Sequence, residues 1–209
     1  MALVKYNNNS ISAVTSASSI PSGALTHIKT LTASSSATLS FVHGSSDVVL
    51  DNTYPIYKFE FINIHPASND ADFQFNMSTD SGSNYNVTKT TTIFNAYHYE
   101  NDSGANVVYD TGSDLAQSTS DQIIAGNQGV GNDNDQSVSG SLMLFNPSST
   151  TFVKHFMTST NAYHHADITV NGFVAGYGNT TSAIDGVIFQ FNTGNIDAGT
   201  IKLYGIKDS

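Results

Sequence analysis

Hydrophobic and polar residues alternate along much of this chain with a period of two. Between residues 57 and 61, Tyr57, Phe59 and Phe61 alternate with Lys58 and Glu60. This alternation predicts a half-buried strand in an antiparallel sheet, because successive strand residues point to opposite faces. The same period, or a short apolar run, predicts further strands at residues 27–32, 37–42, 73–77, 87–99, 140–145, 152–157, 186–191 and 200–206.

Turn-forming residues separate these segments at regular intervals, and the long run at 87–99 forms either one strand or two strands separated by a bend. A chain with about eight to ten strands must bury one face of each sheet, which favours two packed sheets. We therefore predict an all-β fold, an antiparallel β-sandwich of the jelly-roll type. The predicted core contains Leu39, Phe41, Phe59, Phe61, Phe75, Leu142, Leu144, Phe189, Phe191, Ile201 and Leu203.

Residues 1–24 differ from the rest because they are small and polar, with few apolar side chains. Such a segment cannot hold a core of its own, so it is either a disordered leader or an arm that orders against a partner. We predict an extended N-terminal arm at residues 1–24 that anchors a sandwich domain at residues 25–209. The anchoring residues would be Tyr6, Asn7, Asn8, Ile11, Val14 and Ile20.

The first residues have no apolar core of the kind found in signal peptides, so we expect synthesis in the cytoplasm of a cell without a signal peptide. No stretch approaches the roughly 20 apolar residues of a membrane span, which argues against membrane insertion. The net charge is −10, with 7 Lys+Arg, all of them lysine, against 17 Asp+Glu. This charge opposes binding to nucleic acid, because phosphate binding depends on clustered cations.

Motifs for catalysis are weak. The chain has no cysteine nucleophile and no Gly-x-Ser-x-Gly elbow. Asp110 and Asp114 are a conceivable glycosidase pair, but aspartates are frequent in the predicted loops and such pairs arise by chance. We predict that the protein is not an enzyme.

The best metal candidate is the segment 131–137, where Asp133 and Asp135 would supply oxygen ligands for calcium. The segment does not match the EF-hand template, and the alternative is a solvated turn, since Asn and Asp favour turns. Zinc is not expected, because the adjacent His164 and His165 would point to opposite faces of a strand. We predict no cofactor, with calcium at these aspartates left open.

Residues 100–137 are mostly polar with several glycines, so we expect a long irregular segment of the kind that often carries function. Tyrosines in or beside polar segments could stack on the sugar rings of a glycan, although tyrosine is also a normal edge and interface residue of sheets. The candidates are Tyr97, Tyr99, Tyr109, Tyr163 and Tyr177.

Several segments resemble a group of proteins from phages of marine and freshwater bacteria, cyanophages above all. The resemblance is carried by residues 6–12 (YNNNSIS), 57–66 (YKFEFINIHP), 85–92 (YNVTKTTT), 96–100 (AYHYE) and 196–207 (IDAGTIKLYGIK). It implies a virion structural protein on the particle surface, such as a capsid decoration, fibre or tail component. Its partners would then be other virion proteins and further copies of itself, with trimers suited to a fibre. The alternative is a tail adhesin that binds a carbohydrate receptor of the host.

Overall fold

The computed structural model describes residues 24–207, apart from the side chains of residues 126–128. This part of the chain forms twelve strands, and every pairing between them is antiparallel. The all-β antiparallel class is therefore confirmed. The strands are β1 (Leu25–Thr32), β2 (Leu39–Val42), β3 (Ile56–Pro66), β4 (Ala71–Ser78), β5 (Lys89–Tyr99), β6 (Ala105–Tyr109), β7 (Gln122–Val130), β8 (Val138–Phe145), β9 (Lys154–His164), β10 (Ile168–Gly178), β11 (Gly186–Phe191) and β12 (Ile196–Ile206).

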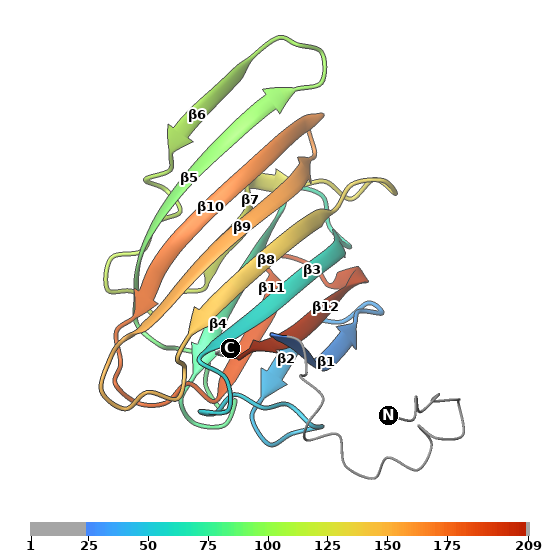
Figure 1. The fold of residues 1–209 in the computed structure, drawn as a ribbon. Coiled ribbons are helices and arrows are strands. Elements are labelled where there is room, and N and C mark those ends of the chain that lie inside the picture. The colour runs from blue at the N-terminus through green and yellow to red at the C-terminus, as the bar shows by residue number, and fades with distance from the viewer. Residues whose placement is uncertain (1–23, 208–209) are drawn as a thin grey trace, which may run out of the picture.

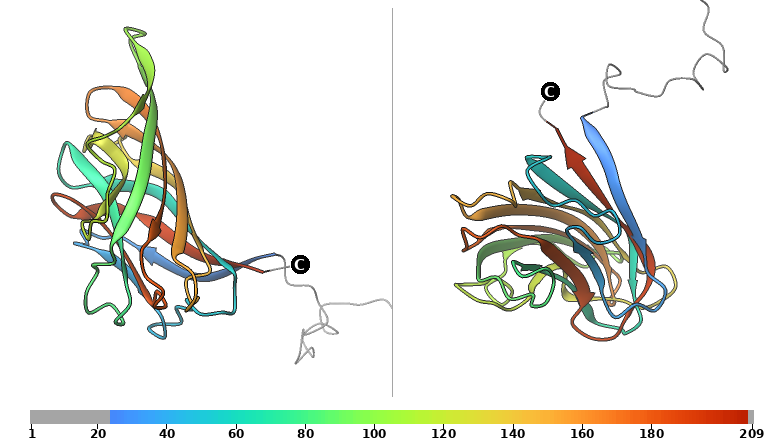
Figure 2. Two further views of the ribbon diagram at one scale, coloured as in Figure 1. Left: turned by 90° about the vertical axis from the view of Figure 1, so that its left-hand side faces the viewer. Right: turned by 90° about the horizontal axis from the view of Figure 1, so that it is seen from below.

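The strands form one continuous sheet whose main path, β1-β12-β3-β8-β9-β7-β4-β11-β2, is nearly closed and resembles a barrel (Figure 2). Its two halves face each other as layers and meet where Val130 of β7 pairs with His164 of β9. A branch leaves this path at β9, where β10 pairs with β9, β5 with β10, and β6 with β5. In Figure 1 these three strands continue the front layer beyond the strands behind it. The branch therefore gives the protein a sheet extension that ends in the edge strand β6.

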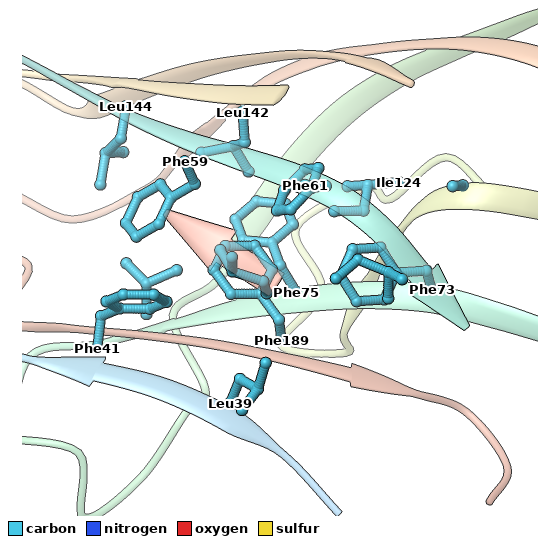
Figure 3. Packing of buried hydrophobic residues seen from close by; sticks show 14 of the residues in the cluster. Leu39, Phe41, Phe59, Phe61, Phe73, Phe75, Ile124, Leu142, Leu144 and Phe189 are labelled. Carbon is cyan, nitrogen blue, oxygen red and sulfur yellow. The ribbon is translucent and has the colours of Figure 1, made fainter. Parts of the chain in front are cut away.

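Aromatic side chains fill the space between the two layers (Figure 3). Phe189 of β11 lies at the centre, with its ring centroid 5.2 Å from that of Phe59 and 5.2 Å from that of Phe61. These contacts are tilted or edge-to-face, which the quadrupole of an aromatic ring favours. All residues of the predicted core are buried, so that prediction is confirmed.

The strand predictions hold where apolar and polar residues alternate strictly, and the run at 87–99 is a single strand, β5, that begins at Lys89. Three strands differ from the prediction. The segment 100–137 is not irregular throughout, since it contains β6 and β7, and the segment 168–178 forms β10, for which no strand was predicted. The predicted N-terminal arm lies almost entirely outside the described residues.

The strand β10 was not predicted from the sequence, because glycines such as Gly172 and Gly176 are typical of turns. In the sheet, these two positions lie so close to neighbouring atoms that a larger side chain would not fit without displacing them. A Cβ atom at Gly176 would lie 2.5 Å from the backbone oxygen of Thr90 on β5, and one at Gly172 would lie 3.1 Å from Oδ1 of Asn95. Glycine thus allows β10 to pack closely against its neighbours.

Candidate interaction surface

The outer face of the sheet extension carries a row of exposed aromatic rings. We define the outer face as the outward-pointing side chains of β9, β10, β5 and β6. Strand register places Phe94 of β5 between Phe173 of β10 and Tyr109 of β6. Cross-strand partners share one face of a sheet, so the three rings form a continuous row. The Phe94 and Phe173 rings stack with centroids 5.0 Å apart and an interplanar angle of 17°.

These rings are far more exposed to solvent than the aromatic side chains of the core of this protein. The exposed fractions are 45% for Phe94, 38% for Phe173 and 53% for Tyr109. Val107, also on β6, is 67% exposed. Clustered exposed apolar side chains of this kind mark interaction sites more often than scattered ones do.

A groove of about 450 Å³ lies beside this row on the same face. The rings of His155 and Tyr177 meet edge-to-face along it, with centroids 6.1 Å apart. Met157 of β9 is 51% exposed, and its flexible thioether side chain can adapt to the shape of a partner. The residues lining the groove are Thr90, Thr91, Thr92, Phe145, His155, Phe156, Met157, Ala175, Gly176 and Tyr177.

The outward strand positions of the outer face also carry no formal charge, although carboxylates lie at its margins, Asp114 beside Tyr109 and Glu100 beside Tyr163. Its outward positions on β5, β10 and β9 carry Thr, Phe, Ala, His, Asn, Tyr, Met and Ser, but neither Asp, Glu nor Lys. The chain as a whole has a net charge of −10. Contact between two such chains through charged faces would be opposed by like-charge repulsion. The outer face is therefore suited to an uncharged partner or to another copy of the chain.

The five tyrosines predicted to contact glycan do not converge. Tyr177 lines the groove, and Tyr109 ends the aromatic row. Tyr97 and Tyr99 lie on the other face of β5, together with the buried Ile93, and their rings meet edge-to-face at 6.0 Å. The structure thus divides the set between two faces of the extension.

Tyr163 lies on the outer face at the far end of β9, among acidic groups. A hydrogen bond to Glu100, aided by the nearby charge of Asp167, raises the pKa of Tyr163 to about 12. The Tyr163 hydroxyl lies 3.4 Å from Oδ1 of Asp167. A small cavity of about 160 Å³ here is lined by Glu100, Asn161, Ala162, Tyr163 and Thr169. This end of the sheet offers hydrogen-bonding groups beside one aromatic ring.

The two aspartates predicted to bind calcium lie in the exposed turn before β8. The backbone of Asp133 accepts from the Gln136 amide at 2.8 Å, and its own amide donates to Oε1 of Gln136 at 3.0 Å. Asp135 lines a polar pocket with His65. Within residues 24–207, no three or more His, Asp or Glu side chains gather in a way that could hold a metal ion. Calcium binding at Asp133 and Asp135 remains a prediction.

The histidine pair at 164 and 165 and the aspartate pair at 110 and 114 lie at the end of a strand or in the turn that follows it. His164 and His165 do not diverge, as was expected of strand neighbours: their rings stack with centroids 4.2 Å apart, because β9 ends at His164 and His165 lies in the following turn. Asp110 and Asp114 lie in the turn after β6, where Asp110 accepts from the Gly112 amide and Asp114 accepts from the Tyr109 hydroxyl. Both carboxylates thus hold turn structure.

Sequence reasoning did not identify the main residues of the outer face, Phe94, Phe173, His155 and Met157. The available signal was an apolar side chain on the otherwise polar face of a strand, as with Phe94 between Thr92 and Ala96. That signal becomes informative only when the opposite face is known to be the buried one.

The predicted anchoring residues, Tyr6, Asn7, Asn8, Ile11, Val14 and Ile20, lie outside the described residues. Within the part of the chain that the structure describes, no helix is long and apolar enough to cross a membrane. Comparisons of the chain with protein-family models, with curated proteins and with solved structures give no match.

Proposed function

We propose that this chain is a non-enzymatic structural protein displayed on the surface of a phage particle, as a capsid decoration, fibre or tail component. The observation that supports this most directly is the uncharged aromatic outer face. A strongly acidic protein that is packed in many copies needs one face that another copy can approach. The outer face would make this contact, while the acidic residues on the rest of the surface would keep the assembly soluble.

The fold is consistent with this role. We propose that the two-layered, nearly closed sheet is of the jelly-roll type, an architecture common in capsid proteins. The N-terminal segment would attach the folded domain to the particle, for example by adding a strand to an exposed sheet edge of another virion protein. Attachment and copy-to-copy contact would then use different parts of the chain.

Location on the particle is the direct test. Gold-labelled antibodies raised against residues 25–209 should decorate intact particles of the phage that encodes this chain. Deletion of residues 2–20 should leave a folded domain that no longer co-purifies with particles. Absence of the chain from purified particles would refute the proposal, and full incorporation of the deletion variant would refute the anchoring role alone.

A second candidate function, a host adhesin that binds carbohydrate, is favoured by two features of the outer face. The Tyr177 groove offers an aromatic ring beside threonine hydroxyls, and the Tyr163 cavity offers Asn161 and Glu100 as hydrogen-bonding groups. Sugar recognition combines ring stacking with such polar contacts. A glycan array probed with the full chain and with Tyr177→Ala tests this candidate, since binding lost in the variant would support it and no binding by either would exclude it.

A further inference from the structure

Lys89, the first residue of β5, has a fully buried side chain. Its Nζ donates to Oδ1 of Asn76 at 2.6 Å and to the carbonyl oxygen of Val87 at 2.8 Å. Asn76 lies on β4 and is only 1% exposed. A buried amine is thereby held against a buried carboxamide.

Hydrogen bonds fix the orientation of the Asn76 amide. Its Oδ1 also accepts from the Met77 amide at 2.9 Å, while its Nδ2 donates to Oδ1 of Asp121 at 2.7 Å and to the carbonyl oxygen of Thr119 at 3.1 Å. If Oδ1 and Nδ2 of Asn76 exchanged places, the nitrogen would face the Met77 and Lys89 donors and the oxygen would face the Asp121 carboxylate. The hydrogen bonds therefore determine which of the two atoms is the oxygen. The carbonyl of Asn76 therefore faces the amine, and its nitrogen faces a carboxylate.

Asp121 is itself held in place. Its Oδ2 accepts from Nε2 of Gln190 at 2.7 Å. The chain just before it pairs with the start of β5, since Lys89 and Ser118 exchange backbone hydrogen bonds at 2.7 and 3.0 Å. The amine, the amide and the carboxylate thus come from three separate segments that the fold fixes against one another.

We propose that Lys89 and Asn76 react to form an intramolecular isopeptide bond, with Asp121 as the group that transfers the proton. Because a C=O bond is about 1.23 Å long, Nζ lies no more than about 4 Å from Cγ of Asn76. This separation is close to that of reacting atoms in a near-attack geometry. The reaction would be a modification of the protein by its own side chains, separate from the proposed particle role.

The atoms of the step balance without another reactant. The neutral Lys89 amine adds through its lone pair to Cγ of Asn76, forming the C–N bond and moving the carbonyl electrons onto Oδ1. Asp121 accepts a proton from the attacking nitrogen and passes it to Nδ2, which leaves as ammonia when the C–Nδ2 bond breaks. Asp121 ends in its starting state, as expected of a general acid–base group.

The surroundings of Lys89 supply the neutral amine that the step requires. Burial away from water lowers the pKa of Lys89 to about 8, an effect that the negative charge of Asp121 partly offsets. Among the described residues, a second buried lysine near this end of the extension is Lys154 of β9. Lys154 and Lys89 both pair with Gly178 of β10, from opposite sides of that strand. The Nζ of Lys154, however, donates to the carbonyl oxygens of Phe152 and Thr180. The rate of bond formation should therefore rise as the pH passes 8.

The bond would join two strands, β4 and β5, that do not pair directly with each other. β4 pairs with β7 and β11 in one layer, whereas β5 pairs with β10 and β6 in the extension. A covalent link at residues 76 and 89 would fasten the extension to the opposite layer and close the loop between them. Such a link would stabilise the fold by restricting the unfolded chain, as other cross-links do.

Cyanogen bromide cleavage gives a clear test, because Met77 lies between the two residues. Cleavage after methionine separates residues 2–77 from residues 78–143 unless a covalent bond joins them. We expect the full chain, incubated above pH 8, to lose the mass of one ammonia and to keep these fragments linked. Sequencing of the linked pair should place the bond between Asn76 and Lys89, which excludes a succinimide as the cause of the mass loss.

Three variants separate the roles. Lys89→Leu, which adds no cleavage site, should give separate fragments, and Asp121→Asn should slow linkage by at least tenfold. Lys154→Leu, which removes the other lysine that is buried among the described residues, should link as the wild type does. As linkage proceeds, the wild-type Tm should rise by roughly 5–10 °C, the size expected for closing a loop of about this length. Wild-type chain that is folded by circular dichroism but still yields separate fragments after prolonged incubation would overturn the proposal. Linkage of Asp121→Asn at the wild-type rate would overturn the role of Asp121.

Discussion

Phe94 on β5 and Phe173 on β10 are direct cross-strand partners whose rings stack on the outside of the sheet extension. Each ring keeps more than a third of its surface exposed, so the pair contributes less to folding than a core pair does. We expect the double variant Phe94→Ser/Phe173→Ser to reduce the free energy of unfolding by about 1–2 kcal/mol. If the outer face joins copies of the chain, as proposed, self-association should weaken far more, which sedimentation velocity of wild type and variant would measure.

Phe152 provides the matched control for this prediction. It is 69% exposed, yet it lies in the segment before β9, apart from the aromatic row. Phe152→Ser should leave the association state unchanged. If both variants weaken association equally, the effect comes from general surface hydrophobicity and not from the outer face.

Phe189 represents the opposite case, a ring whose neighbours close it off from water. It is fully buried and contacts Phe59, Phe61 and Phe73 from the opposite layer and from β4. Phe189→Ala removes these contacts and leaves a cavity that the surrounding strands cannot fill, which costs about 3–5 kcal/mol. Urea unfolding of the variant measures this loss, and a value below about 1 kcal/mol would show that the core repacks.

Asp80 makes the turn after β4 sensitive to acid. Its carboxylate accepts from the Asn84 amide at 2.9 Å and from Nδ2 of Asn84 at 2.7 Å, and these hydrogen bonds, with one from Ser78, lower the pKa of Asp80. A lowered pKa means that the folded state holds the proton less tightly than the unfolded state does. The stabilisation is therefore complete above the ordinary pKa of 3.8 and is lost as the pH falls through the lowered value.

The pH test compares wild type with Asp80→Asn. The variant should unfold more easily than the wild type at neutral pH, and the two stabilities should converge in strong acid. Asn84→Ala removes the Nδ2 donor but keeps the backbone amide, so the pKa of Asp80 should be lowered less and the acid transition of this variant should lie at a higher pH than that of the wild type. A stability difference between wild type and Asp80→Asn that is constant from neutral pH to strong acid would show that the Asp80 charge has no part in holding the turn.

The strands that the sequence predicted well are those with strict alternation, such as residues 57–61, because this period is a local property of the chain. Which face of a strand becomes the buried one is not local. In β5 the buried side carries Lys89 and Asn95, while Phe94 lies outside, an arrangement that hydrophobicity alone assigns the wrong way round. The position of the second layer and of the segment before β7 decides the outcome.

The candidate sites show the same limit. Period-two alternation already separates Tyr97 and Tyr99 from Phe94, but the sequence does not show that Phe173 and Tyr109 are its partners on neighbouring strands. The contact between Asn76 and Lys89 depends on two strands that do not pair with each other. Long-range pairings of this kind are fixed by the register of the whole sheet, which no single segment specifies.

Gly176 lies where β10 packs closely against β5, and replacing it tests whether this close packing requires glycine. A Cβ atom there would lie 2.5 Å from the Thr90 carbonyl oxygen and 2.7 Å from Cγ2 of Thr91, so Gly176→Ala must push β10 away from β5. We expect a loss of about 1–3 kcal/mol, typical of overpacking, measured by thermal or urea unfolding. Gly104→Ala is the matched control, since its Cβ would meet the Tyr99 ring at an ordinary 3.6 Å. Equal stabilities of the two variants would mean that β10 and β5 have room to separate, and that glycine at residue 176 is not required for their pairing.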